Sequence, residues 1–342
     1  MNRYLFFRTP NINMLAAVYD GKDLVLKEDV SLPKLKESDV LIKVKAAGIC
    51  GTDLSILKRT YQIPVPRILG HELSGVVSEV GKKVTQVQVG DRVTSEINLS
   101  CGNCYFCKSG QRTQCLSVKA IGIYEDGAFA KYIKVPESNL HKIFDIPFEE
   151  ATFIEPIAAA LQTFEMAPLQ QNDNTVVIIG AGKLGLLILQ VIKNRGRKAI
   201  VVDKSHLELA KELGADVIIP LEKDPVKKVM EETKNIGADI VVEATGTPDS
   251  MDLALSLVRN RGTINLKSTH GIRTMTDLTQ IVVRELKLQG SRCGPFTPAI
   301  EMLKEGKIQV KPLISATFPL TQIKEAIDAA TKSENIKIIL FP

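Results

Sequence analysis

The sequence predicts an α/β protein with a β-rich N-terminal domain followed by a doubly wound parallel sheet. Its 342 residues exceed what one hydrophobic core usually serves, so two domains are expected. Residues 14–150 contain short runs of Val, Ile and Leu broken by Gly, Pro and Asp, which is typical of a β-barrel or sandwich. From about Ala151 onward, apolar strands alternate with helical patterns, which indicates βαβ units.

The strand pattern of the second half is regular enough to place each strand. Six parallel strands make a complete doubly wound domain, and we expect them at residues 175–179, 199–203, 217–220, 240–243, 262–266 and 286–289. A helical stretch at 298–304 and a strand pattern at 337–340 exceed what this sheet requires. We therefore predict a first domain at 1–150, a Rossmann domain at 151–291, and a return of 292–342 to the first domain.

Composition and charge exclude several classes of partner. The net charge of +5 comes from 44 basic and 39 acidic residues, and no block of like charges forms a nucleic-acid arm. No segment approaches the run of roughly 18 apolar residues that a membrane span needs. We therefore expect neither a nucleic-acid nor a membrane partner. Four of the six cysteines lie within residues 101–115, which favours metal binding over disulfides and a reducing, cytoplasmic setting.

A buried strand runs directly into the motif G-x-G-x-x-G, which an apolar helix follows. Gly180 permits the tight turn, Gly182 lets the backbone approach a pyrophosphate, and Gly185 lets the helix pack on the strand. Lys183 and Leu184 fill the variable positions at a helix N-terminus, whose amides bind phosphate. An isolated glycine triplet would have plain turns as its alternative, but the strand and helix around this one predict a dinucleotide site.

The second strand of this domain ends at Asp203. A carboxylate at that place accepts hydrogen bonds from the adenosine ribose and repels a 2′-phosphate, so NAD is favoured over NADP. Lys204 lies beside it and weakens the repulsion. The alternative is that Asp203 only caps the next helix.

Cys101, Cys104, Cys107 and Cys115 have the spacing C-x2-C-x2-C-x7-C. Four thiolates at this spacing can surround one Zn²⁺ and leave no open position, so we predict a structural zinc that folds a lobe at about residues 98–118. The alternatives are an iron–sulfur cluster and a group of thiols without metal. A nucleic-acid-binding zinc ribbon would need a basic patch beside the cysteines, which the sequence lacks.

A second, looser set combines Cys50, His71, Glu72 and Glu155. Mixed thiolate, imidazole and carboxylate ligands with room for water are typical of a catalytic zinc, whose open position admits substrate. A single cysteine or histidine is more often a core or surface residue, so the prediction depends on the conjunction. Cys293 has no metal partner at motif distance and is predicted to be a packed thiol.

Together these motifs resemble the zinc-containing medium-chain alcohol and polyol dehydrogenases. The spacing from Cys50 to His71 and on to Cys101, the four-cysteine lobe and the later glycine motif match that family over about residues 14–342. The resemblance implies a GroES-like β-barrel catalytic domain that carries both zinc ions, a Rossmann domain, and an active site in the cleft between them. It also implies hydride transfer between a CH–OH group and a nicotinamide cofactor.

The resemblance assigns roles position by position. Cys50 and His71 are similar to the fixed ligands of the catalytic zinc, and Glu72 and Glu155 to carboxylates that bind it directly or through water. This set resembles the polyol, sugar and threonine dehydrogenase branch more than the simple alcohol branch, where a second cysteine completes the site; no cysteine lies near Glu155 in the sequence. Asp53 resembles the carboxylate that accepts the free N–H of the ligand histidine, with an exposed turn residue as the alternative.

The same resemblance suggests a path for the proton. Thr52 is placed to accept the proton of a substrate hydroxyl, whose acidity a zinc ion increases. Ser55 stands where the alcohol branch has a histidine that passes this proton on, so the exit route is left open.

The alternative to an enzyme is a catalytically silent zinc- and dinucleotide-binding protein, because a fold alone does not establish function. The intact ligand set favours the enzyme. The resemblance implies an alcohol, polyol, sugar or hydroxy amino acid as substrate. It also implies a homodimer or homotetramer, since both are common among similar proteins.

Overall fold

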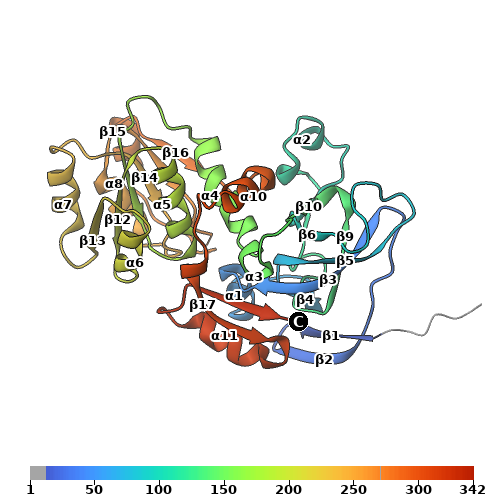
Figure 1. Cartoon of the computed structure of the whole chain (residues 1–342). Coiled ribbons are helices and arrows are strands. Elements are labelled where there is room, and N and C mark those ends of the chain that lie inside the picture. Colours follow the sequence, from blue (N-terminus) through green and yellow to red (C-terminus); the bar gives the residue numbers. More distant parts are fainter. Residues whose placement is uncertain (1–12, 270) are drawn as a thin grey trace, which may run out of the picture.

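The computed structural model describes residues 13–269 and 271–342 and shows two lobes side by side (Figure 1). One lobe contains a six-stranded sheet, and the other contains a seven-stranded and a three-stranded sheet. Helix α4 (Ile154–Met166) and helix α10 (Phe296–Lys304) lie between the lobes (Figure 1). In the described part of the chain, no helix combines the length and apolar character that crossing a bilayer requires.

The main sheet of the first lobe takes strands from both ends of the chain. Its strands are β3 (Asp39–Gly48), β5 (Glu72–Val80), β6 (Arg92–Ser95), β9 (Tyr132–Pro136), β10 (Leu140–Lys142), β17 (Ile314–Pro319) and β18 (Lys337–Phe341). They run in the order β10-β6-β5-β3-β18-β17, and β9 also pairs with β3. The antiparallel pairing of β18 with β3 brings the C-terminal strand beside the residues that precede Cys50.

The second sheet of this lobe closes over its core. Strands β2 (Leu24–Ser31), β1 (Asn13–Tyr19) and β4 (Arg67–Ile68) pair in that order. Alternate side chains of β3, such as Ile42 and Val44, are buried in one cluster with Ala16 and Val18 of β1, as the period of two in a strand requires. Helix α11 (Ile323–Thr331) adds Ile323 and Ala326 to the same cluster.

The six-stranded sheet of the second lobe is parallel throughout. Its strands are β11 (Thr175–Ile179), β12 (Lys198–Asp203), β13 (Val217–Pro220), β14 (Ala238–Glu243), β15 (Val258–Leu266) and β16 (Lys287–Gly290). Their order, β13-β12-β11-β14-β15-β16, is that of a doubly wound sheet. All six strands expected from the sequence are present, and the predicted fold class is confirmed.

Helices cover both faces of this sheet, which is why its strands read as continuous apolar runs. Val176 and Ile178 of β11 pack in one cluster with α4, α10 and α5 (Lys183–Asn194). Val177 and Ile179 point to the other face and pack in a cluster with α7 (Pro225–Glu232) and α8 (Ser250–Leu257). The remaining helices of the lobe are α6 (Leu207–Glu212) and α9 (Leu278–Val283).

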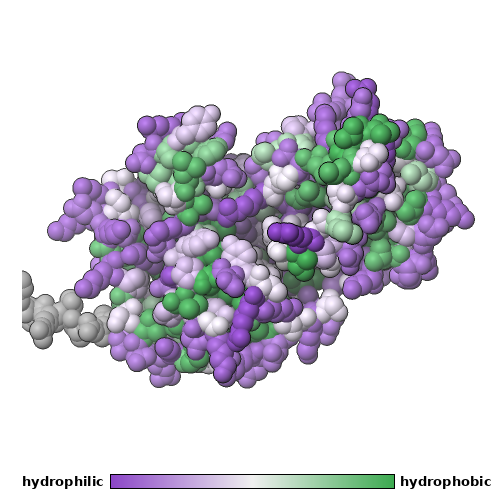
Figure 2. Space-filling view, turned by 180° about the vertical axis from the view of Figure 1, so that it is seen from behind, coloured by the Kyte–Doolittle hydropathy of each residue, from purple (hydrophilic) through white to green (hydrophobic). Residues whose placement is uncertain are grey.

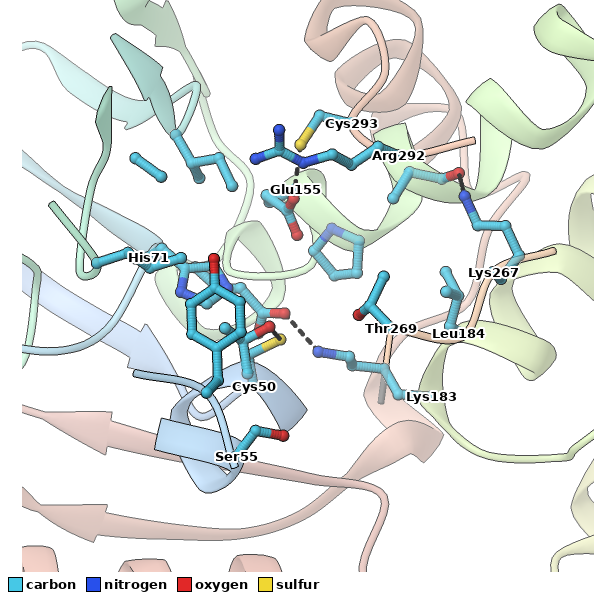
Figure 3. A pocket seen from close by; sticks show the side chains of 18 of the residues that line it. Cys50, Ser55, His71, Glu155, Lys183, Leu184, Lys267, Thr269, Arg292 and Cys293 are labelled. Carbon is cyan, nitrogen blue, oxygen red and sulfur yellow. Dashed lines mark hydrogen bonds and ion pairs between the residues drawn. The ribbon is translucent and has the colours of Figure 1, made fainter. Parts of the chain in front are cut away.

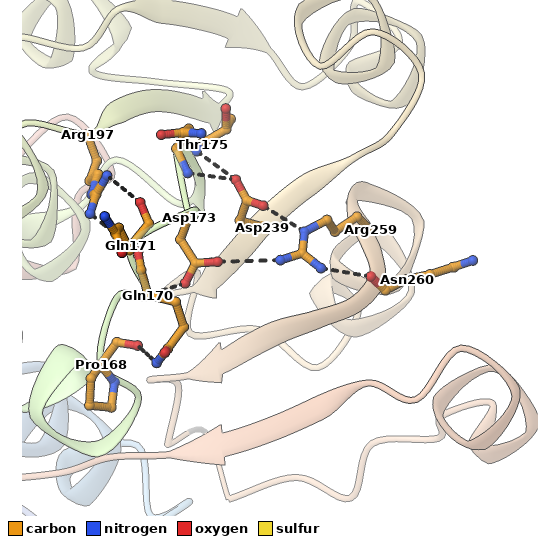
Figure 4. Close-up of polar contacts among 10 residues, drawn as sticks. Pro168, Gln170, Gln171, Asp173, Thr175, Arg197, Asp239, Arg259 and Asn260 are labelled. Atoms are coloured by element: carbon orange, nitrogen blue, oxygen red, sulfur yellow. Dashed lines mark hydrogen bonds and ion pairs between the residues drawn. The ribbon is translucent and has the colours of Figure 1, made fainter.

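A charged network ties together the amino ends of three strands of this sheet (Figure 4). The Asp239 carboxylate accepts hydrogen bonds from the backbone N–H groups of Asn174 and Thr175, at 2.9 Å each, and from Arg259 Nε at 2.6 Å. Arg259 also pairs with Asp173 at 3.4 Å. These contacts fix the edge opposite to the glycine motif, and they leave the carboxyl edge for binding.

Candidate active site

A cavity of about 450 Å³ opens between the two lobes (Figure 3). The first lobe contributes Cys50, Thr52, Ser55, His71 and Glu72 to its walls, and the second contributes Glu155, Lys183, Leu184, Lys267 and Thr269. Every residue that the sequence predicts for the catalytic zinc therefore borders one space, although their positions span more than a hundred residues of chain.

The register of two paired strands explains how Cys50 and His71 meet. Gly48 at the end of β3 lies opposite Glu72 at the start of β5. Cys50 follows Gly48 by two positions and precedes α1 (Gly51–Leu57), and His71 directly precedes Glu72. One ligand atom from each of Cys50, His71 and Glu72 lies within 4.8 Å of the others.

Glu155 enters the cavity from the first turn of α4. It is not part of the three-residue group, although it lines the same space. Burial raises the pKa of its carboxyl.

Cys293 is far from Glu155 in the sequence but close to it in the structure, because its Sγ lies 4.0 Å from Glu155 Oε1. Burial and the Glu155 charge raise the pKa of this thiol to about 11, so it stays protonated at neutral pH.

Two lysines hold the carboxylate of Glu72. Lys183 from the glycine motif pairs with Oε1, and Lys337 from the first position of β18 pairs with Oε2. The side chains of Glu72 and Lys337 are completely buried. A buried carboxylate is tolerated only where opposite charges compensate for its lost hydration, so this pairing joins the two lobes at the cavity.

The electrostatics of the Cys50 thiol suit a metal ligand. Burial alone would raise its pKa, but the positive charges of Lys183 and His71 outweigh burial and lower the pKa well below the ordinary value. Metal binding requires the thiolate, and a thiol that loses its proton readily binds at lower cost.

The Nδ1 atom of His71 lies farther from the Asp53 carboxylate than the resemblance implies. Asp53 was predicted to accept its N–H, and the distance from Nδ1 to Asp53 Oδ1 is 3.7 Å, which is too long for a hydrogen bond. Asp53 is fully buried and accepts instead from the backbone N–H groups of Cys50 at 2.8 Å and Gly70 at 3.2 Å. The buried His71 Nδ1 has no hydrogen-bond partner among the described residues.

A zinc ion fits this donor set. A thiolate, an imidazole and a carboxylate converge from three chain positions onto one point in an open cavity, which is the donor chemistry of a catalytic zinc with a free position.

The four cysteines fit a second, closed site. The Sγ atoms of Cys104 and Cys107 are 3.5 Å apart, and those of Cys101 and Cys107 are 4.0 Å apart. Tetrahedral Zn–S bonds of roughly 2.3 Å place neighbouring sulfurs about 3.8 Å apart. All four ligand atoms lie within 4.8 Å of one another, and all four thiols are free. The segment is framed by β7 (Asn98–Leu99) and β8 (Lys119–Ala120) and carries α2 (Tyr105–Lys108).

The glycine motif lies at the carboxyl end of β11. Gly180 has φ +106°, and a Cβ there would come within 2.7 Å of the Ala244 carbonyl oxygen. A Cβ on Gly185 would collide with the carbonyl oxygen of Gly180. Gly182 faces open space as the N-cap of α5. The backbone is therefore exposed where a pyrophosphate approaches the helix N-terminus.

Asp203 braces this loop from the end of β12. Its Oδ2 accepts a hydrogen bond from the Ala181 N–H, and its Oδ1 accepts from the Ser205 N–H at 3.4 Å. The carboxylate is thus held beside the glycine turn, in the position from which the predicted contact with ribose would be made.

The predicted proton path begins at the metal cluster. Thr52 Oγ1 lies 4.0 Å from Cys50 Sγ. Ser55, one helical turn further on, donates to the Gly51 carbonyl oxygen at 3.0 Å. Both hydroxyls line the cavity, and Ser55 is partly exposed.

Sequence reasoning missed three cations that border or support the cavity: Lys267, Arg292 and Lys337. The sequence contains a pattern from which two of them could have been found. Lys267 directly follows an apolar strand, and Lys337 interrupts the apolar run at 336–340. A charged side chain in or next to a strand that is buried on both faces needs a hydrogen-bond or ion-pair partner. Such a residue can therefore be singled out from the sequence as a candidate site residue.

Comparison with known proteins gives matches to both halves of the chain. Residues 36–145 match the alcohol dehydrogenase GroES-like domain, and residues 184–305 match the zinc-binding dehydrogenase domain. The β-rich first domain is therefore GroES-like, as the resemblance implied.

Matches over the full length agree. The chain is 36% identical to a D-arabitol-phosphate dehydrogenase of Enterococcus avium, with 94% of each chain covered. It is 34% identical to an L-threonine 3-dehydrogenase of Caldanaerobacter subterraneus, with 94% of this chain and 96% of the relative covered. An Escherichia coli CFT073 structure described as a short chain alcohol dehydrogenase in complex with NADH superposes with a TM-score of 0.89, at 30% identity, over 97% of this chain and 100% of that one.

The two metal sites predict a defined zinc content. Wild-type protein should contain two zinc ions per chain by elemental mass spectrometry, Cys50→Ser should retain one, and Cys293→Ser should retain both because its thiol stays protonated. Cys101→Ser should lose the other ion and lower the thermal midpoint by roughly 5 °C or more, because the four-cysteine lobe depends on metal. Two zinc ions in Cys50→Ser would show that Cys50 is not a ligand.

Proposed function

Because this chain belongs to the zinc-containing medium-chain alcohol and polyol dehydrogenases, we propose that Cys50, His71 and one of the carboxylates Glu72 and Glu155 hold its catalytic zinc in the cavity between the lobes. The chain is a zinc-dependent oxidoreductase that transfers a hydride between a CH–OH group and a nicotinamide cofactor. The convergence of Cys50, His71 and Glu72 within 4.8 Å, in a cavity that the glycine motif also borders, carries the residue assignment.

The protein groups divide the work of the reaction. When bound, zinc supplies a Lewis acid that makes a substrate hydroxyl more acidic. Thr52 Oγ1 accepts a hydrogen bond from the substrate hydroxyl and, as it takes up that proton, releases its own to water that reaches the cavity beside the partly exposed Ser55 hydroxyl. Residues Gly180, Gly182, Lys183, Leu184 and Gly185 position the cofactor, and Asp203 binds its ribose. Thr269 and Leu184 form the wall of the cavity on the side of the six-stranded sheet.

The four-cysteine lobe and the domain limits belong to the same proposal. Cys101, Cys104, Cys107 and Cys115 hold a structural zinc that takes no part in the reaction. The catalytic domain comprises residues 1–150, of which 1–12 lie outside the described residues, together with 292–342, and the Rossmann domain comprises 151–291. A reducing, cytoplasmic setting suits both metal sites, since each needs free thiolates.

The substrate is a small molecule with a CH–OH group. The named relatives act on a polyol phosphate and on threonine, so the panel for this chain includes alcohols, polyols, sugars, their phosphates and hydroxy amino acids.

Turnover tests the assignment directly. We expect zinc-replete protein to reduce NAD with at least one member of this panel, and Cys50→Ser to lower kcat/KM at least about a thousandfold because the substrate oxygen loses its activating ion. NADH binding, followed by fluorescence, should persist in Cys50→Ser as the control for folding. Wild-type activity in this variant would refute the ligand assignment, and a zinc-loaded enzyme that is inert toward the whole panel would favour a silent binding protein.

We propose NAD as the preferred cofactor because the Asp203 carboxylate lies beside the glycine turn and would repel a 2′-phosphate. Among the solved structures that this chain resembles, one is described with NADH and another, a zinc-binding dehydrogenase of Sinorhizobium meliloti, with NADP, so the proposal depends on Asp203.

Removing the Asp203 charge should change cofactor preference. Asp203→Asn keeps an oxygen that accepts from Ala181 N–H, and we expect the ratio of kcat/KM for NAD over NADP to fall at least about tenfold because the repulsion is removed. Glu208→Gln, on the exposed first turn of α6, is the matched control. A wild-type preference for NADP, or an unchanged ratio in Asp203→Asn, would contradict this role.

We propose a homodimer or homotetramer, and an exposed apolar surface on the six-stranded sheet supports it. Strand β16 is an edge strand, and α9 beside it has no buried residue. Met275, Leu278, Val282 and Val283 are 67–92% exposed, which is unusual for apolar side chains gathered in one segment. Figure 2 shows hydrophobic side chains gathered on the lobe that contains this sheet.

Charge on this surface should separate the subunits. Wild-type protein should have two or four times the mass of one chain in sedimentation, and Val282→Glu should shift it toward the monomer because a carboxylate would be desolvated at the interface. Val89→Glu changes a valine that is 61% exposed on the other lobe and is the control. A wild-type monomer would exclude the proposed assembly.

A further inference from the structure

The charges around the cavity do not balance. Three cations line it, Lys183, Lys267 and Arg292, and two carboxylates face them, Glu72 and Glu155. Glu72 is already compensated by Lys183 and by Lys337 behind it. Within residues 13–269 and 271–342, neither Lys267 nor Arg292 has a carboxylate oxygen within ion-pair distance, and Glu155 acts on the Lys267 charge only from farther away.

Lys267 acts as a support for the chain that carries Arg292. It is 7% exposed and directs its ammonium group at neutral oxygens only. Its Nζ donates to the Ala159 carbonyl at 3.0 Å, to the Ser291 carbonyl at 3.1 Å and to Ser291 Oγ at 2.8 Å. Three donors meet three acceptors, so Lys267 has no hydrogen left for a ligand and instead fixes the turn after β16.

Arg292 follows Ser291 and points into the cavity beside Cys293 and Glu155 (Figure 3). Its Nη2 donates to Asn98 Oδ1 at 3.0 Å, and Asn98 is itself 4% exposed. This contact to a neutral amide holds one nitrogen of the guanidinium group. The remaining N–H groups form a fork that matches the paired oxygens of a phosphate or a carboxylate.

Two tyrosines line the cavity together with Arg292. Tyr61 and Tyr124 both line it. Burial and the neighbouring Tyr124 hydroxyl raise the pKa of Tyr61, although the nearby Arg292 charge acts in the opposite direction. The Tyr61 hydroxyl therefore keeps its proton and can donate it in a hydrogen bond to anionic oxygens beside the guanidinium group.

We propose that the substrate carries an anionic group, a phosphate monoester or a carboxylate, away from its reacting CH–OH carbon, and that Arg292 binds this group. This inference rests on the proposed function, because it takes the cavity as the substrate site. The reacting carbon lies at the Cys50 and His71 end, and the anionic group lies at the Arg292, Tyr61 and Tyr124 end.

The same distribution of charges argues against an amino acid as the substrate. An α-ammonium group would need a carboxylate of its own, but Glu72 is held by two lysines, which leaves Glu155 as the carboxylate available to the proposed zinc. The expected substrate is therefore a polyol phosphate or a hydroxy acid without an amino group.

Calorimetric titration of the zinc-loaded, NADH-saturated protein tests this inference. The probes are D-arabitol, D-arabitol phosphate, D-arabinonate and L-threonine. We expect the phosphate, the carboxylate or both to bind at least about 30-fold tighter than D-arabitol, because charge-assisted hydrogen bonds to the guanidinium group are gained. The tighter of the two anions identifies which group the site recognises, and L-threonine should bind no tighter than D-arabitol.

Variants separate recognition from folding. Arg292→Gln should remove the advantage of the anion over D-arabitol, and Arg292→Lys should keep part of it, since it retains the charge without the fork. Arg195→Gln, which changes an arginine at the end of α5 paired with Glu165, is the matched control and should keep the full advantage. The thermal midpoint of each variant reports folding.

Two results would overturn the inference: D-arabitol binding as tightly as both anions, or an undiminished anion advantage in a folded Arg292→Gln. Failure of the proposed function would give a different result, namely no reduction of NAD with any member of the substrate panel. The two results above are measured by binding and do not depend on turnover.

Discussion

The completely buried carboxylate of Glu72 constrains the whole site. It lies at the start of β5, and its counterions come from the first residue of β18 and the first residue of α5. One charge cluster thus connects two strands of the seven-stranded sheet, β5 and the C-terminal strand β18, to helix α5 of the other lobe. A buried charge without partners is costly, so this cluster stabilises the arrangement in which the cysteine and histidine face the glycine motif.

The cluster also distinguishes the two carboxylates of the cavity. Each oxygen of the Glu72 carboxylate already has an ammonium partner, Lys183 or Lys337. Glu155 has no ammonium or guanidinium group within ion-pair distance among the residues that the structure describes, and burial raises its pKa. A cation beside Glu155 would lower the free energy of its charged form. Arg292 lines the same cavity and has no carboxylate oxygen within ion-pair distance among the described residues.

The sequence was sufficient for the features that depend on local pattern. The six strands of the parallel sheet follow from apolar runs between helical patterns, and the glycine turn and four-cysteine lobe follow from spacing. Cys50, His71, Glu72 and Glu155 could be grouped because they match a family layout. Residues that depend on long-range contacts could not be placed from the sequence. Lys337 reaches Glu72 because β18 pairs with β3, and Arg292 lies in the cavity beside a turn that Lys267 holds through Ser291. Cys293 lies beside Glu155 for the same reason, although no cysteine is near it in the sequence.

A crystal structure of the zinc-loaded protein with NADH, with anomalous scattering recorded at the zinc edge, would locate both metal ions. We expect one peak among the four cysteines and a second within about 2.0–2.3 Å of Cys50 Sγ and a His71 ring nitrogen, facing the nicotinamide ring. A single peak at the four cysteines, or a second peak beyond bonding distance of Cys50 and His71, would contradict it.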